Sequence, residues 1–178
     1  MMQKLLPFVL LVLSQTARGQ GKNEELIPWN GNQKLTWADY KGKPKENSDA
    51  AASTATYLGF EFNVGKNGFD YKITCTFSKT KSWGLHKTDY ILMHEQGHFD
   101  IAEIFARKLN KKMSEYKFNN NSFKEDLKEI YQSIAIEKDA FQNQYDEETN
   151  HSIKKEKQAE WLKKINDQLK ELADFSDY

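Results

Sequence analysis

Two neighbouring stretches in the first half of the chain alternate between hydrophobic and polar positions. In residues 69–77 the apolar side chains occupy every second position: Phe69, Tyr71, Ile73, Cys75 and Phe77. This period of two predicts a strand with one buried and one solvated face. Residues 51–64 alternate in part and are rich in Thr, aromatic and branched side chains, and residues 65–68 (GKNG) have hairpin-loop composition. We therefore expect two strands paired antiparallel.

From Thr88 onward the apolar residues recur with the period of a helix. Thr88 is the expected N-cap of the first helix, and Ser122 with Glu125 forms a candidate capping box before the second. Three apolar stripes with helical spacing follow Thr88, over residues 91–112, 123–145 and 153–172. A small antiparallel sheet followed by helices predicts an α+β fold.

Composition narrows the class of protein and of partner. A length of 178 residues favours one domain with a sizeable core. The 26 basic and 26 acidic side chains cancel, so charge gives no reason to expect nucleic acid or an anionic membrane as a partner. Cys75 is the only cysteine, which excludes an internal disulfide and a cysteine-based zinc site. Nothing in the sequence specifies an oligomeric state.

The N-terminus has the pattern of a secretory signal peptide. Lys4 precedes an apolar run over 5–13, and Ala17 and Gly19 are small residues at the positions that signal peptidase reads. We expect cleavage after Gly19, which leaves residues 20–178 as a single domain that is secreted or periplasmic. An uncleaved anchor or a buried helix is the alternative, but the run is short for a bilayer. No later run has membrane length, so the mature chain is expected to lack a transmembrane segment.

The stretch HEQGHFD contains the residues that a zinc hydrolase needs. His94 and His98 are four residues apart, so on a helix they lie on one face and can reach one zinc ion. Glu95 follows the first histidine, where a carboxylate can take a proton from zinc-bound water. This is the HExxH pattern of metallopeptidases. The alternative is an ordinary helical face that carries two solvated histidines.

A catalytic zinc site usually takes three protein ligands, and the third is not near the motif. The stretch that follows His98, FDIAEIFARKL, contains no histidine. Asp100 and Glu103 in this stretch lie about 160° and 140° around the helix from His98. We expect Glu103 to pair instead with Arg107, four residues on. The third ligand must come from a later helix.

Two residues near the end of the second helical stripe are candidates for the third ligand. His151 lies at the junction of the last two predicted helices, and Asp146 in the same YDEETNHS stretch could bind the metal or orient a ligand histidine. His86, the remaining histidine, lies in a loop-like stretch. Residue chemistry alone leaves His151 balanced between a ligand and a solvated or capping residue.

Gly97 sits inside the predicted motif helix, where glycine costs up to about 1 kcal/mol relative to alanine. We expect another element to approach the helix closely there, and the strand over residues 69–77 is the natural candidate. A free edge on that strand could pair with an extended peptide.

Several stretches together resemble a known family: LTWADYKGKP, FSKTKSW, LMHEQGHFDIAEIFARKL and YDEETNHS, followed by Gln158 and Trp161. They are similar to the DUF922 family of predicted secreted zinc-dependent proteases of bacteria, over about residues 35–165. The resemblance implies an exported metalloprotease-like domain that binds zinc, and it places His151 ahead of the other third-ligand candidates. One departure is Ser152, where the family pattern leads us to expect glycine.

These observations predict a zincin-like α+β domain that hydrolyses peptide bonds in a peptide or protein substrate. Zn²⁺ is expected on His94, His98 and His151, with Glu95 as general base and later proton donor. Two further roles are expected at the site: Asp146 as a supporting or replacement ligand, and Tyr145 as an oxyanion stabiliser. One alternative is a non-catalytic exported binding or assembly module that keeps this fold. Another is an exported helical interaction protein in which the motif is accidental.

Overall fold

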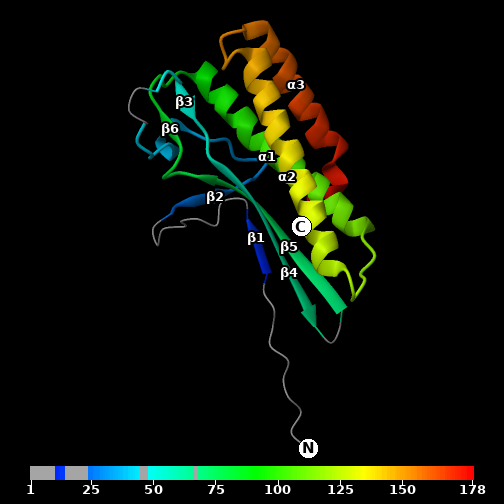
Figure 1. The fold of residues 1–178 in the computed structure, drawn as a ribbon. Helices are drawn as coiled ribbons and strands as arrows, with labels where there is room; N and C mark the ends of the chain where they lie inside the picture. Colours follow the sequence, from blue (N-terminus) through cyan, green and yellow to red (C-terminus); the bar gives the residue numbers. More distant parts are fainter. Residues whose placement is uncertain (1–10, 15–23, 45–47, 66–67) are drawn as a thin grey trace, which may run out of the picture.

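The expected hairpin forms the centre of a four-stranded antiparallel sheet (Figure 1). Its strands, in spatial order, are β1 (Leu11–Ser14), β4 (Thr56–Gly65), β5 (Gly68–Ser78) and β2 (Leu26–Pro28). The computed structural model describes residues 11–14, 24–44, 48–65 and 68–178. The expected signal peptide over residues 1–19 lies outside these residues except for β1.

The alternating pattern of the hairpin is confirmed by its burial. Leu58, Phe60 and Phe62 of β4 are buried, and Leu58 and Phe60 lie opposite the buried residues Cys75 and Ile73 of β5. This face packs against the helices and the opposite face does not, so apolar residues occupy every second position of the two strands. Burial raises the pKa of the Cys75 thiol well above its usual value, as expected for an inert core cysteine.

The strand expected over residues 51–64 is divided in two. Its first part, β3 (Ala52–Ser53), leaves the large sheet and pairs with β6 (Trp83–Gly84). The backbone at the division is held by the neighbouring loop, since Ala55 N donates to Ser82 Oγ at 2.9 Å and Ala55 O accepts from Ser78 N at 2.9 Å. The division turns Thr54 away from the sheet and toward the helices.

Three long helices follow the sheet: α1 (Asp89–Glu115), α2 (Phe123–Thr149) and α3 (Lys155–Glu171). The short helix η1 (Trp37–Asp39) lies between β2 and β3, and η2 (Ala173–Phe175) follows α3. The predicted N-cap of α1 is confirmed, because Thr88 Oγ1 accepts from Ile91 N at 3.2 Å. Ser122 precedes α2 as expected, but the capping box with Glu125 does not form. Its hydroxyl donates instead to Asp126 Oδ2 at 2.8 Å.

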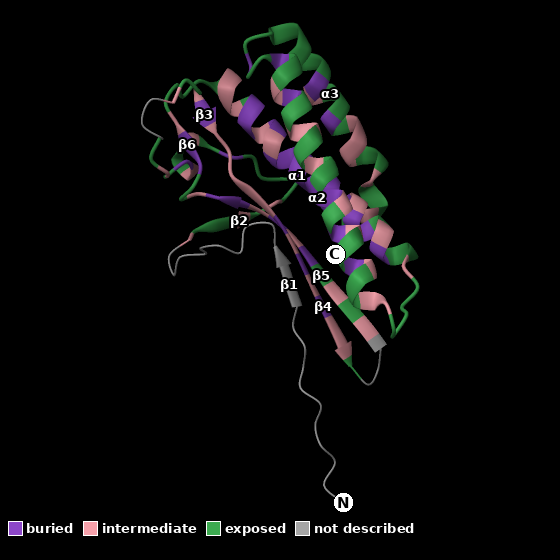
Figure 2. Cartoon of the chain, in the orientation of Figure 1, coloured by how far each residue is buried: buried purple, intermediate pink, exposed green. Residues whose placement is uncertain are grey.

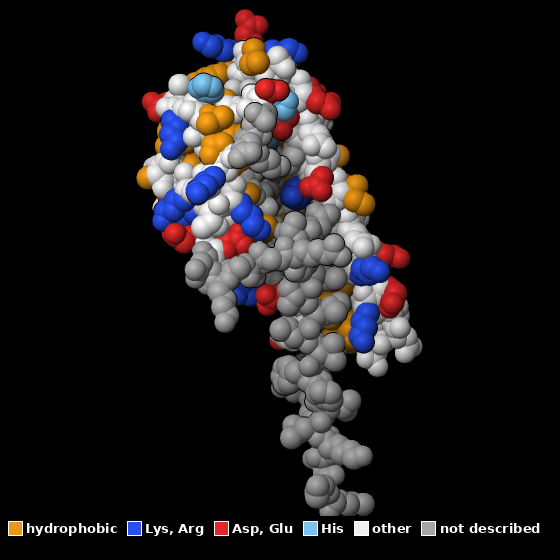
Figure 3. All heavy atoms as spheres, turned by 60° about the vertical axis from the view of Figure 1, so that its left-hand side comes forward, with side chains coloured by type: hydrophobic (Ala, Val, Ile, Leu, Met, Phe, Trp, Pro, Cys, Tyr) orange, Lys and Arg blue, Asp and Glu red, His pale blue; other side chains and the backbone are white. Residues whose placement is uncertain are grey.

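Helix α1 is the central element of the fold. One side packs on β4 and β5, and the other contacts α2 and α3, which present exposed outer faces (Figure 2). The order of sheet and helices confirms the α+β class. No described helix is long and apolar enough to cross a membrane. On the face drawn in Figure 3, acidic and basic side chains are interspersed rather than gathered by sign.

Candidate metal centre

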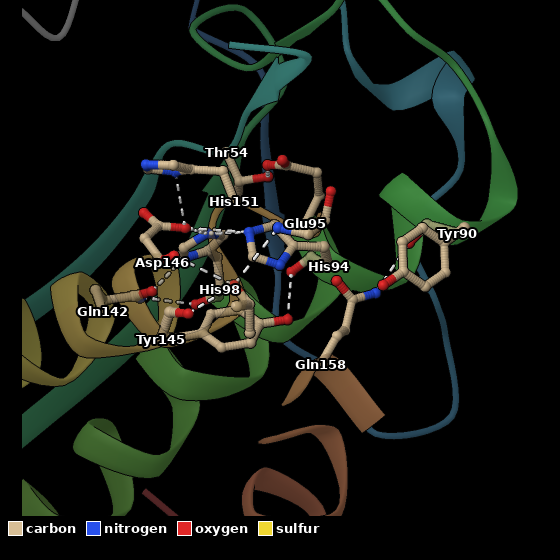
Figure 4. Close-up of polar contacts among 12 residues, drawn as sticks. Thr54, Tyr90, His94, Glu95, His98, Gln142, Tyr145, Asp146, His151 and Gln158 are labelled. Carbon is tan, nitrogen blue, oxygen red and sulfur yellow. Dashed lines mark hydrogen bonds and ion pairs between the residues drawn. The ribbon is translucent and has the colours of Figure 1, made fainter. Parts of the chain in front are cut away.

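The two motif histidines meet one carboxylate from α2 (Figure 4). His94 Nε2 and His98 Nε2 are 3.3 Å apart, and Asp146 Oδ1 lies 3.1 Å from each. Tetrahedral ligands about 2.0–2.1 Å from a zinc ion are about 3.3–3.4 Å apart. The spacing of the three donor atoms therefore fits a single small cation, and among the described residues these three form the group of potential ligands.

The charges in this group are strongly coupled. Burial opposes ionisation of Asp146, but its hydrogen bonds to His94 and His98 outweigh that effect and hold its pKa well below the usual range. Burial likewise disfavours the charged form of His98, yet the bond to Asp146 and the charge of that carboxylate leave the pKa of His98 raised. The carboxylate of Asp146 therefore acts as the counter-ion of the His98 imidazole.

His151 lies on the outer side of Asp146 and is not among the three clustered donors. Its Nδ1 is 3.5 Å from Asp146 Oδ1, and its side chain is 72% exposed. The geometry thus favours Asp146 over His151 as the third ligand, and a role for His151 as ligand stays a prediction. The histidine is nevertheless close enough to hydrogen-bond the carboxylate through a modest side-chain movement.

The turn that carries His151 has unusual backbone geometry. Asn150, His151 and Ser152 have φ values of 48°, 49° and 73°. For non-glycine residues this left-handed region costs roughly 1–2 kcal/mol each. The turn is held by backbone bonds from His151 N to Asp146 O at 2.9 Å and from Lys154 N to Thr149 O at 2.8 Å. The φ of Ser152 explains why glycine would suit that position.

Glu95 is buried beside the histidines and is bonded to an element far away in the sequence. Thr54 Oγ1 donates to Glu95 Oε2 at 2.6 Å, and Tyr40 OH lies 2.8 Å from Thr54 Oγ1. Burial raises the pKa of Tyr40 well above its usual value, so its hydroxyl keeps its proton. The tyrosine therefore donates to the threonine, which donates to the carboxylate. This chain holds one oxygen of Glu95 in place.

An open cleft of about 540 Å³ lies above the site, and its lining includes Thr54, Glu95 and the two motif histidines. One wall is the segment 50–56, the floor is the motif face of α1, and the other wall includes Lys138 and Gln142 of α2. The strand over residues 69–77, on which a free edge was considered for peptide pairing, contributes no residue to this cleft. Its outer side is paired with β2 only at Thr76, Phe77 and Ser78, so peptide pairing along the rest of β5 stays a prediction. The wall nearest the motif is instead the segment that contains β3.

Tyr145 packs beneath the two motif histidines and does not line the cleft. Its ring stacks on His94 with centroids 4.5 Å apart, its side chain has no exposed surface, and its hydroxyl lies 3.3 Å from His94 O. Burial raises the pKa of Tyr145 well above its usual value. This placement gives no support to the expected oxyanion role. Tyr145 is also the close neighbour of Gly97, where the strand over residues 69–77 was expected.

Sequence reasoning missed three residues that support the site: Tyr40, Thr54 and Gln142. Gln142 contacts His98 Nδ1 through Oε1 and donates through Nε2 to His98 O at 2.9 Å. Gln142 precedes Asp146 by four residues, so the two side chains lie on the same face of a helix. This spacing is the sequence signal that could have identified Gln142 as a site residue. No such signal exists for Thr54, since its contact depends on the division of the strand.

The comparisons with known proteins give one match. The model of a family described as "Bacterial protein of unknown function (DUF922)" matches residues 41–152, which is more than half of the chain and includes His94, Glu95, His98, Asp146 and His151. No curated protein and no solved structure matches the chain.

Proposed function

Because the chain belongs to the DUF922 family, whose function is unknown, we propose from the site itself that it is a zinc-dependent metallopeptidase. The observation that carries the proposal is the convergence of three donor atoms within 3.3 Å of one another, with a buried carboxylate on the adjacent residue and an open cleft above. The HExxH spacing and the α+β order make the domain zincin-like in this proposal. The signal-peptide pattern over residues 1–19 supports the part of the proposal that the domain is periplasmic or secreted.

In this proposal, zinc is held by His94, His98 and Asp146. A bound zinc ion supplies a Lewis acid that polarises a peptide carbonyl and acidifies a water molecule. Glu95 accepts the proton of the attacking water and returns it to the leaving amine. Thr54 holds one oxygen of Glu95, so the other oxygen is left to handle the proton. His151, at the mouth of the cleft, supports Asp146.

The cleft also suggests how a substrate is held. The segment 50–56 is built of Ala, Ser and Thr, so its short side chains allow another backbone to approach. An extended peptide laid along this wall would place its carbonyls over the motif face of α1. The cleft thus suits a peptide or an unfolded loop of a protein.

The test compares metal content and hydrolysis in the chain purified without a histidine tag. We expect about one zinc per wild-type chain by elemental analysis, and loss of zinc in the double variant His94→Ala, His98→Ala. With fluorescent casein and a mixed peptide pool as probes, Glu95→Gln should keep zinc and lose about 10²–10⁴-fold in rate. Glu125→Gln, an exposed residue of α2, is the matched control and should retain full activity.

Three results would contradict parts of the proposal. A wild-type chain without zinc would reject the metal site. Zinc binding without hydrolysis of any probe would favour the non-catalytic binding module. Full hydrolysis by Glu95→Gln would reject the role of Glu95 while leaving the metal site intact.

A further inference from the structure

Each motif histidine has a glutamine from another helix beside it (Figure 4). Gln142 comes from α2 and Gln158 from α3. Both anchor on backbone carbonyls of α1, with Gln142 Nε2 donating to His98 O at 2.9 Å and Gln158 Nε2 donating to Tyr90 O at 3.2 Å. Because a carbonyl can only accept, these bonds identify the amide nitrogen of each glutamine and leave each Oε1 as a free acceptor.

For His98, the acceptor atom Gln142 Oε1 already contacts the imidazole ring. Gln142 Oε1 contacts His98 Nδ1, and an amide oxygen cannot donate. The proton of a neutral His98 ring must therefore lie on Nδ1. Nε2, the atom that faces His94 and Asp146, is then the free lone pair. Gln142 thus fixes His98 in the tautomer that a metal requires.

For His94 the corresponding two atoms are both without partners. His94 Nδ1 and Gln158 Oε1 are each buried and make no hydrogen bond. They belong to the same part of the site, because the carbonyl that anchors Gln158 is one helical turn before His94. Figure 4 shows the Gln158 side chain reaching from α3 to this part of α1. A buried donor and a buried acceptor are rarely left unpaired in native proteins.

Metal binding makes this unpaired state untenable. A ligand imidazole is neutral, so coordination through His94 Nε2 forces the proton onto Nδ1. That proton is then buried between α1 and α3 and needs an acceptor. Pairing it with Gln158 Oε1 satisfies both orphaned atoms and gives His94 the same support that His98 receives from Gln142.

We propose that Gln142 and Gln158 are a matched pair of positioning residues, each accepting the Nδ1 proton of one motif histidine and aiming its Nε2 at the metal. This inference rests on the metal site proposed above. Neutral amides suit the role because the cluster already contains one ligand carboxylate. A second and third carboxylate beside the rings would lower the net positive charge on which Lewis acidity depends.

The test is zinc affinity measured by competition with a chromophoric chelator. Gln142→Met and Gln158→Met keep the side-chain length and remove the carboxamide, and each should weaken zinc binding by about 10–100-fold. Gln168→Met is the matched control, since Gln168 also lies on α3 and also has a buried Oε1 without a partner, but lies about 15 Å along the helix from Gln158. It should bind zinc as wild type does. Gln158→Glu, which keeps an oxygen acceptor, should bind zinc more tightly than Gln158→Met.

A second measurement separates positioning from packing. In the zinc-loaded protein, nuclear magnetic resonance should detect Nδ1 protons of both His94 and His98 that exchange slowly with water. Gln158→Met should lose this protection at His94 alone, and Gln142→Met at His98 alone.

The inference is overturned if Gln158→Met keeps wild-type zinc affinity and a protected His94 proton. It is also overturned if Gln168→Met loses as much affinity as Gln158→Met, because the effect would then belong to the packing of α3. A wild-type chain that takes up no zinc rejects the metal site and this inference together. Normal zinc binding without hydrolysis leaves the inference standing while the proposed activity fails.

Discussion

At the scale of single residues, Asp146 is the residue that contacts all three histidines of the candidate site. Its Oδ1 faces three imidazoles, with His94 and His98 at 3.1 Å and His151 at 3.5 Å. The carboxylate is half-buried and the outer histidine is exposed, so their roles differ. In the proposed metal site, Asp146 is a ligand and His151 supports Asp146 from the outer side.

This difference predicts unequal losses of zinc affinity. Asp146→Ala removes a proposed ligand and should weaken binding by more than about 100-fold. His151→Ala removes only a supporting partner and should weaken it by about 10-fold. Isothermal titration of both variants measures the two effects. The reverse order would make His151 the third ligand, as the family resemblance alone suggests.

At the scale of elements, the crossing of α1 and α2 depends on the absence of a side chain at Gly97. A Cβ there would lie 2.6 Å from Tyr145 Oη and 3.0 Å from Cζ. The glycine lets the ring of Tyr145 lie flat under His94 and reach its carbonyl. The cost in helix propensity is therefore offset by contact between two helices and not by contact with the sheet.

Gly97→Ala is expected to destabilise the fold by about 1–2 kcal/mol. The substitution gains up to about 1 kcal/mol in helix propensity, but overpacking of a tight core contact costs typically 1–3 kcal/mol. Urea unfolding measures the difference. In a Tyr145→Phe background, Gly97→Ala should lower the unfolding free energy by less, because the hydroxyl oxygen nearest to the new Cβ is absent. A higher unfolding free energy for Gly97→Ala would show that Tyr145 moves aside freely.

At the scale of the whole molecule, buried polar residues of α1 hold the C-terminal segment. Glu103 accepts from Arg107 Nε at 2.8 Å and from Tyr178 OH at 2.5 Å, and Asn110 Nδ2 donates to Phe175 O at 3.0 Å. The pair of Glu103 and Arg107 expected from their spacing is confirmed. Burial raises the pKa of Glu103 even though both partners lower it.

This pKa shift predicts how stability changes with pH. The folded pKa of Glu103 exceeds its ordinary value of 4.5, so its favourable contribution is present below that value and is lost as the pH rises through the folded pKa. The advantage of wild type over Glu103→Gln in unfolding free energy should therefore narrow as the pH rises from 4.5 through the raised folded pKa of Glu103. Urea unfolding at several pH values measures it. An advantage that widens with pH would show that the charge pair with Arg107 outweighs burial.

Local patterns in the sequence determined the hairpin, the start of the first long helix and the positions of the motif residues. The period of two identified the hairpin, the helical period and Thr88 located the start of α1, and HExxH placed His94, Glu95 and His98 on one face. These features follow from interactions within a few residues of chain, so they can be read without knowledge of the fold.

Only the tertiary structure decided the contacts between distant segments. The packing of α2 on α1 brings Asp146 into contact with both motif histidines. The turn after α2 leaves His151 exposed, on the outer side of Asp146. The tertiary structure brought Thr54 to Glu95 through a division in a strand that alternation predicts as continuous. It also set Gln142 and Gln158, from two different helices, beside the two histidines. Such contacts depend on how elements pack, and one-dimensional periodicity does not encode that packing.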